Sequence, residues 1–144
     1  MLDSMIESPS PTRAEASDVA TAVFDAADCL MLSAETASGK FPVESVKIMD
    51  RIIRGVENDN SYRQILESKQ IKLEETTSDA ISSAASQVVK TVLAKAIFTY
   101  TRSGATAKRA ARERPTVPII GLSPERITAR QLALIWGVHT IHAL

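Results

Sequence analysis

The segment TYTRSGAT, residues 99–106, has the composition of a binding site for an anionic group. Its hydroxyl side chains surround a glycine, which lets the backbone approach a ligand closely. A helix is expected to begin just after this glycine, and the free N–H groups of its first turn favour a phosphate. The candidate ligand-binding residues are Thr101, Ser103, Gly104 and Thr106, with Arg102, Lys108 and Arg109 as further cations. The alternative is that the Ser-Gly pair only caps the helix and that the basic residues form a solvated face.

A second candidate site follows the short apolar run at residues 29–32. Such a run is typical of a strand that is buried on both faces of a parallel sheet. Because α/β proteins carry their chemistry on the loops after such strands, Ser33 and Glu35 are candidate catalytic residues. Spacing alone also allows a helix cap or a turn, which is the commoner role of a Ser-x-Glu pair. Cys29, within the run, is expected to be a buried and chemically inert side chain.

The first part of the chain has clear signals for two helices around this predicted strand. Thr12 and Glu15 have the spacing of a capping box, so a helix is predicted over residues 13–27. Pro42 is suited to the first turn of a second helix, over residues 42–57. One strand with two helices cannot close a sheet by itself, so this part is expected to belong to a larger fold. Residues 58–78 are expected to be a linker with one helical turn.

The second part of the chain alternates between strand and helix patterns. A helix is predicted from about residue 78 to 94, with Ile81, Ala85, Val88 and Val92 on its buried stripe. Strands are then predicted at 96–100, 117–122 and 138–141, with helices at 105–114 and 125–136 between them. This β-α-β-α-β order predicts a small parallel sheet with helices on both faces.

Composition supports a globular protein and limits its partners. Of the 144 residues, 44% are hydrophobic and 24% are charged, and no apolar run has the roughly 20 residues of a membrane helix. We therefore expect no membrane partner. A single cysteine excludes internal disulfides, which suits a cytoplasmic location. Residues 1–60 hold five basic and eleven acidic side chains, whereas residues 61–144 hold twelve and six. The basic excess permits anionic ligands, but aromatic residues are only 4%, so nucleic acid is not expected.

Three motifs together resemble those of the pyruvate kinase family. The motifs MLDSM, PTRAEASDVATAV and MLSAET occupy residues 1–5, 11–23 and 31–36. They have the order and spacing of MLESM, PTRAE-SDVANAV and MLSGET in that family, with Ala34 in place of the usual glycine. The segment TRSGATA, residues 101–107, is similar to the family's TKSGRSA-like loop. Ala105 departs from the larger polar or basic residue often found in that loop.

The resemblance implies an α/β fold in two parts. Residues 1–58 look like the C-terminal part of a TIM-barrel catalytic domain, that is, a partial (β/α)8-barrel. Residues 59–144 look like the family's C-terminal regulatory domain, a three-layer α/β/α domain with a mainly parallel sheet, truncated at its end.

The resemblance also implies an activity and a set of partners. The family transfers a phosphoryl group from phosphoenolpyruvate to ADP, giving pyruvate and ATP, with Mg²⁺ and K⁺. Its catalytic lysine and metal ligands would lie upstream of Met1, so the 144-residue chain alone is expected to be inactive. Ser33 and Glu35 would take part in a proton-transfer network, and residues 101–106 would bind the phosphate of a sugar-phosphate effector. Arg13 would form an ion pair at a subunit interface or between domains, and the protein would be a homo-oligomer, usually a tetramer.

A different class of function is also open. Residues 79–144 could form a free-standing module that binds a phosphorylated ligand such as a sugar phosphate. This hypothesis depends only on the 99–106 loop, whereas the kinase hypothesis depends on motifs in both parts of the chain.

Overall fold

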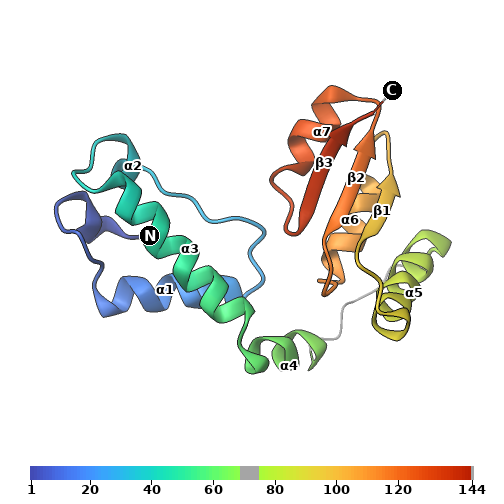
Figure 1. Ribbon diagram of the computed structural model, residues 1–144, viewed down its shortest axis with the longest axis horizontal. Helices are drawn as coiled ribbons and strands as arrows, with labels where there is room; N and C mark the ends of the chain where they lie inside the picture. The colour runs from blue at the N-terminus through green and yellow to red at the C-terminus, as the bar shows by residue number, and fades with distance from the viewer. Residues whose placement is uncertain (69–74, 144) are drawn as a thin grey trace. The chain divides into compact units, whose positions relative to one another are not determined.

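The computed structural model describes residues 1–68 and 75–143 and divides the chain into two compact units, Met1–Lys69 and Gln70–Leu144. Part of the predicted linker, residues 69–74, and the last residue of the chain lie outside the described residues. The predicted domain boundary after residue 58 stays a prediction. Figure 1 shows the helices of the first unit and the sheet of the second.

The described part of the first unit is helical. Its elements are η1 (Asp3–Ile6), α1 (Arg13–Phe24), α2 (Ala34–Ala37), α3 (Pro42–Glu57) and α4 (Asn60–Ser68). The capping box at the start of α1 is confirmed, since the Thr12 side chain accepts from the backbone of Glu15 and the Glu15 side chain accepts from the backbone of Thr12. Pro42 occupies the first turn of α3, as expected. Both helices therefore begin where local chemistry predicts.

The core of the first unit joins segments that are far apart in the sequence. Leu2 and Met5 are fully buried against Val19 of α1 and Met49 of α3. Leu30 and Leu32 pack against the same cluster. The apolar side chains of the segment that contains η1 thus fix it against the core. Its backbone N–H groups remain available for hydrogen bonds to polar side chains.

The prediction of a buried strand at residues 29–32 is wrong. These residues have no strand conformation, Cys29 is exposed, and Met31 is 75% exposed. A strand needs a neighbour for its backbone hydrogen bonds, and no strand lies in the described residues of this unit. The alternation of side chains persists, because Leu30 and Leu32 face the core while Cys29 and Met31 face outward.

The second unit contains a parallel sheet, as the sequence predicts. Its elements are α5 (Thr77–Val92), β1 (Ile97–Tyr100), α6 (Ala105–Arg112), β2 (Ile119–Ser123), α7 (Arg126–Leu132) and β3 (Val138–His142). The strands lie in the order β1-β2-β3, and both pairings are parallel. Ile119 on the central strand pairs with Ile97 on one side and Val138 on the other.

Helices α6 and α7 cover the same face of this sheet (Figure 1). A side chain at Gly121, on the central strand, would contact both Leu132 of α7 and Ala107 of α6. Two successive right-handed crossovers in the same direction place their helices on one side. The expected second helical layer is therefore not found among the described residues.

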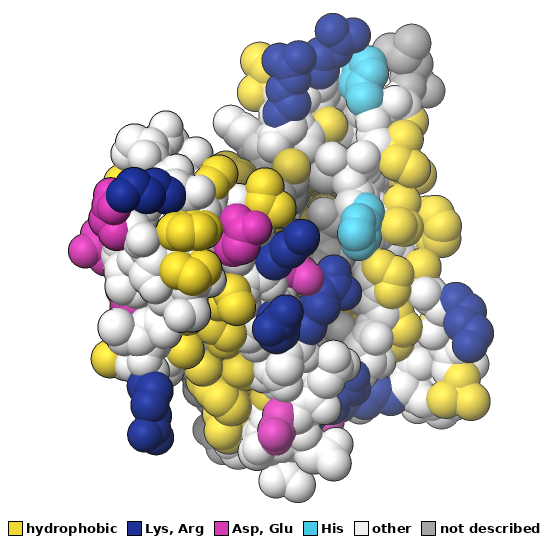
Figure 2. Space-filling model, turned by 60° about the vertical axis from the view of Figure 1, so that its left-hand side comes forward, with side chains coloured by type: hydrophobic (Ala, Val, Ile, Leu, Met, Phe, Trp, Pro, Cys, Tyr) yellow, Lys and Arg dark blue, Asp and Glu magenta, His cyan; other side chains and the backbone are white. Residues whose placement is uncertain are grey.

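The other face of the sheet carries exposed hydrophobic side chains. Phe98 and Tyr100 of β1 are 70% and 64% exposed, and Ile141 of β3 is 51% exposed. Figure 2 shows hydrophobic side chains gathered beside the two histidines, which both belong to β3. The α/β class is confirmed, with two layers rather than three in the described residues.

Helix α5 buries a different face from the one predicted. Ile81, Val88 and Val92 are each more than half exposed, whereas Asp79, Ser82 and Val89 are buried. A charge decides this orientation, because Asp79 forms ion pairs with two arginines of α6. Hydrophobic periodicity alone could not reveal that contact.

No helix in the described ranges is long and apolar enough to cross a lipid bilayer.

Candidate functional site

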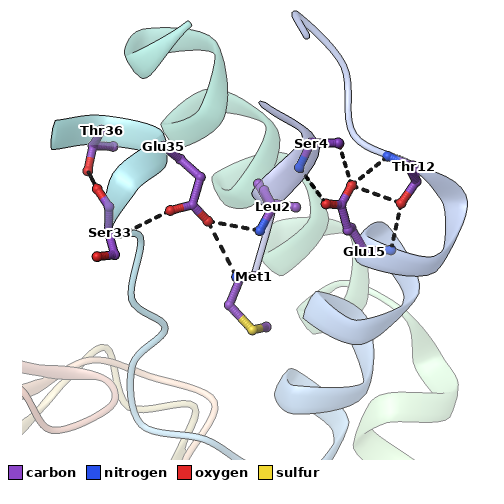
Figure 3. A network of polar contacts seen from close by, with 8 residues as sticks. All are labelled: Met1, Leu2, Ser4, Thr12, Glu15, Ser33, Glu35 and Thr36. Atoms are coloured by element: carbon purple, nitrogen blue, oxygen red, sulfur yellow. Dashed lines mark hydrogen bonds and ion pairs between the residues drawn. The ribbon is translucent and has the colours of Figure 1, made fainter. Parts of the chain in front are cut away.

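Glu35, in the first turn of α2, has a buried carboxylate that is engaged by backbone groups. The Leu2 N–H donates to Oε1 at 3.0 Å, and the Ser33 N–H donates to Oε2 at 2.8 Å (Figure 3). The amino group of Met1 also lies 3.3 Å from Oε1. Glu35 is 3% exposed. The Leu2 N–H, the residue's own N–H and the Ser33 N–H lower the pKa of Glu35 from 4.5 to about 2.

Glu15, in the first turn of α1, holds the same segment from another side. Its Oε1 accepts the Ser4 N–H at 2.7 Å. Its Oε2 accepts the Ser4 hydroxyl at 2.5 Å and both the N–H and the hydroxyl of Thr12, at 2.7 and 2.8 Å (Figure 3). Desolvation raises the pKa of Glu15, but the hydrogen bonds from Ser4 and Thr12 outweigh it and lower the pKa to about 2. Both glutamates are therefore ionised at neutral pH.

Ser33 differs from Glu35 because its hydroxyl lies at the surface. It precedes α2, and its side chain makes no capping hydrogen bond. Its carbonyl accepts from the Thr36 hydroxyl at 3.2 Å, and its N–H is held by Glu35 (Figure 3). The structure thus brings the two predicted catalytic residues together, with Ser33 exposed to solvent and Glu35 enclosed. Their catalytic role stays a prediction.

Arg13, the predicted interface residue, is exposed at the start of α1. It is adjacent to the capping residue Thr12, so the turn that fixes Thr12 also fixes its backbone. An exposed arginine next to a rigid helix start is compatible with an ion pair between subunits. That role stays a prediction.

The loop at residues 101–106 is preformed by its own hydrogen bonds. The Gly104 N–H donates to Oγ1 of Thr101 at 2.9 Å, and Thr128 of α7 donates its hydroxyl to the Arg102 carbonyl at 2.7 Å. Gly104 has φ of +84°, which glycine adopts without strain, and a side chain there would meet Leu132 at 3.2 Å. The loop therefore has one well-defined shape before any ligand binds.

The exposed groups of this loop suit an anion. Ser103 and Thr106 are exposed at the start of α6, and so is Lys108. Arg102 lies 3.2 Å from Glu125, in an ion pair that is itself exposed. Arg109, which the sequence suggested as a further cation for the loop, instead pairs with Asp79. The structure thus keeps the predicted loop but removes one of its expected cations.

Sequence reasoning missed three polar partners. Ser4 and Glu125 gave no signal, because their contacts join segments that are not close in sequence. Asp79 lies three residues after Thr76, whose side chain accepts from its N–H. That spacing signals a helix cap, but it does not reveal that the carboxylate reaches Arg109 and Arg112 of α6.

Two domains of one protein family match this chain, one in each unit. "Pyruvate kinase, barrel domain" matches residues 1–46, and "Pyruvate kinase, alpha/beta domain" matches residues 79–144. The first contains the network of Glu15 and Glu35, and the second contains the parallel sheet and the 101–106 loop.

Whole-chain comparisons agree with these matches. A pyruvate kinase of Methylorubrum extorquens is 52% identical over 141 residues, which are 98% of this chain and 30% of that protein. One of Agrobacterium vitis is 53% identical over 138 residues, 96% of this chain and 29% of that protein. One of Clostridium acetobutylicum is 43% identical over 141 residues, 98% of this chain and 30% of that protein.

The chain belongs to the pyruvate kinase family. It corresponds to the end of the barrel domain and to the alpha/beta domain, as the sequence motifs predicted. It spans about 30% of the length of the curated relatives it matches. The hypothesis of a free-standing binding module is not favoured, because the similarity runs through both units rather than through the second alone.

Proposed function

We propose that the full-length protein carrying this segment is a pyruvate kinase, which transfers a phosphoryl group from phosphoenolpyruvate to ADP to give pyruvate and ATP. The observation that carries the proposal is 52% identity to a pyruvate kinase along 98% of the chain. The three motifs of the barrel part also lie together in space, joined by Glu15 and Glu35. The enzyme would act in glycolysis, in the cytoplasm and as a homo-oligomer, in keeping with its family.

The described residues of this chain include no candidate metal site for that reaction. Across residues 1–68 and 75–143, no group of three or more His, Cys, Asp or Glu side chains is placed to hold a metal ion. The Mg²⁺ and K⁺ implied by the family are therefore assigned no ligand here, and no step is derived through them. The candidate catalytic group in this chain is the exposed Ser33, on a turn that is held by Glu35.

The activity can be tested directly on the full-length protein. Pyruvate formation from phosphoenolpyruvate and ADP is followed by reducing the product to lactate with NADH. Robust turnover that disappears without ADP supports the proposal, and no turnover with a folded full-length protein refutes it.

The intact mass of the polypeptide in its native cells should be measured first. A mass several times the 15.6 kDa of this chain is required if the kinase is to contain the missing domains.

We also propose that residues 101–106 bind the phosphate of a sugar-phosphate effector. The exposed hydroxyls of Ser103 and Thr106 and the ammonium of Lys108 support this, because they surround the start of α6 on a preformed loop. With glucose 6-phosphate as the probe, Ser103→Asp should abolish binding by placing a negative charge in the loop. Ser78→Asp, an exposed serine in the first turn of α5, makes the same charge change as a control. Equal binding by both variants would exclude the site.

A further inference from the structure

The segment that contains Leu2 and Ser4 is held on two sides by carboxylates. Its apolar side chains are already buried, with Leu2 and Met5 fully enclosed by Val19 and Met49. Its backbone N–H groups are distributed between two glutamates, since Glu35 accepts from Leu2 and Glu15 accepts from Ser4. The position of the segment is therefore specified by apolar packing and by two ionised acceptors at once.

Each glutamate also holds a second segment. Glu15 accepts from Thr12 at the start of α1, and Glu35 accepts from the backbone of Ser33 before α2. Hydrogen bonds to an ionised acceptor are roughly twice as strong as neutral ones. Figure 3 shows the two carboxylates on either side of the segment, pointing toward it. Two glutamate side chains thus link the three family motifs by hydrogen bonds.

The hydrogen bonds and the burial of the Glu35 carboxylate argue against a direct role in proton transfer. Both carboxylate oxygens accept backbone N–H groups, and the residue is 3% exposed. A substrate proton would have to reach a carboxylate that is enclosed and already hydrogen-bonded to backbone groups on both oxygens. The exposed residue beside it is Ser33, whose backbone N–H is held by Glu35.

We propose that Glu15 and Glu35 are positioning residues: they clamp residues 2–4 between the starts of α1 and α2 and so fix the Ser33 hydroxyl at the surface. This inference depends on the proposed function only for its effect on turnover. The clamp itself is a statement about the folded chain and has a separate readout.

The experiment uses the full-length protein with Glu15→Gln and Glu35→Gln, and Glu44→Gln as the matched control. Glu44 is exposed in the first turn of α3, so the same charge is removed where no clamp exists. Hydrogen exchange of the peptide covering residues 2–6 should be at least tenfold faster in both clamp variants and unchanged in the control. The kcat should fall at least tenfold in both, while the pH dependence of kcat keeps the same limbs as in the wild type.

A milder variant guards against simple misfolding. Ser4→Ala removes only the hydroxyl contact with Glu15 and leaves the Ser4 N–H in place. It should lower kcat by about two- to threefold, and the double variant Ser4→Ala with Glu15→Gln should be no slower than Glu15→Gln alone. Such non-additivity is expected when two groups act through one contact.

Three outcomes would overturn the proposal. Unchanged exchange at residues 2–6 would show that no clamp exists, and faster exchange with unchanged kcat would show a purely structural role. Loss or displacement of one limb of the pH profile in Glu35→Gln would instead make Glu35 a direct participant in proton transfer. If the wild type has no kinase activity, the proposed function is wrong, and the exchange data alone decide whether the glutamates hold the segment.

Discussion

Individual carboxylates in the first unit owe their acidity to the groups that donate to them. Glu35 has its pKa lowered to about 2 by the N–H groups of Leu2, of Glu35 itself and of Ser33. Between about pH 4.5 and 2 the folded state thus binds fewer protons than the unfolded state. The stability that this carboxylate contributes is present above pH 4.5 and is lost as the pH falls toward 2.

This linkage predicts how acid destabilises the full-length protein. From pH 6 to pH 3, the thermal midpoint of the wild type should fall more steeply than that of Glu35→Gln, which cannot ionise at this position. Glu44→Gln should follow the wild type, since Glu44 is exposed. Parallel curves for the wild type and Glu35→Gln would show that the carboxylate is not held as described. Differential scanning calorimetry at each pH gives the measurement.

Gly39 permits a close backbone approach beside the same network. A Cβ at this position would lie 2.6 Å from the Glu35 carbonyl oxygen and 3.2 Å from Cα of Ile6. Gly39→Ala should therefore force the backbone apart and destabilise the protein by about 1–3 kcal/mol. Gly55→Ala is the control, because a Cβ there meets nothing within 4 Å, and it should be stabilising by about 0.5–1 kcal/mol in the helix. Urea denaturation measures both, and equal effects would contradict this account.

The site could be predicted from the sequence only where its contacts are local. The hydrogen bond between Thr12 and Glu15 spans three residues, and the capping-box motif predicts it. The one between Thr101 and Gly104 also spans three residues, within a loop that its composition marks as a candidate site. The contact of Glu15 with Ser4 spans eleven residues and that of Glu35 with Leu2 spans 33. No local pattern encodes such distances, so the clamp became visible only in the structure.

Among the elements, α5 shows how one buried charge can override hydrophobic periodicity. Asp79 is fully buried, and its carboxylate oxygens lie 3.1 Å from Nε of Arg109 and 2.9 Å from Nη2 of Arg112. Those arginines are about one third exposed, so part of the charge remains solvated. The ion pairs hold the polar side of the helix against α6 and leave the stripe containing Ile81 and Val88 exposed.

Replacing this carboxylate should detach α5 selectively. Asp79→Asn removes the buried charge that Arg109 and Arg112 share and should cost about 2–3 kcal/mol. Amide exchange should become faster throughout α5 while β1 and β2 keep their protection. Ser78→Ala changes the exposed neighbouring residue and should leave exchange unaltered. Uniformly faster exchange in the sheet as well as in α5 would mean that Asp79 stabilises the whole unit rather than docking one helix.

Elements with local start and stop signals were predicted well, and those that need partners were not. The helix starts at Thr12 and Pro42 and the parallel order of three strands follow from caps and alternation. Which face of α5 is buried depends on charged residues of α6. Which face of the sheet is covered depends on the side on which the β-α-β connections place α6 and α7. These outcomes are set by tertiary contacts, which periodicity does not contain.

On the scale of the whole molecule, residues 29–32 connect this chain to the full-length protein proposed above. Their apolar character predicts a strand buried between neighbours, whereas in the described first unit Cys29 is exposed and Met31 is 75% exposed. The chain covers only about 30% of its curated relatives, so neighbouring strands would come from the rest of such a protein. The Cys29 thiol therefore reports whether those neighbours are in place.

Thiol labelling should distinguish the two situations by a large factor. In the 144-residue chain, Cys29 should react with iodoacetamide at nearly the rate of a free thiol, because exposure and not burial controls access. In the full-length protein the same residue should react at least a hundredfold more slowly, since the pairing of residues 29–32 with adjacent strands would enclose it. Mass spectrometry of the peptide that contains Cys29 measures both rates without interference from other cysteines. Equal rates would mean that this segment stays outside the barrel sheet, and the turn with Ser33 would then need another means of reaching the substrate.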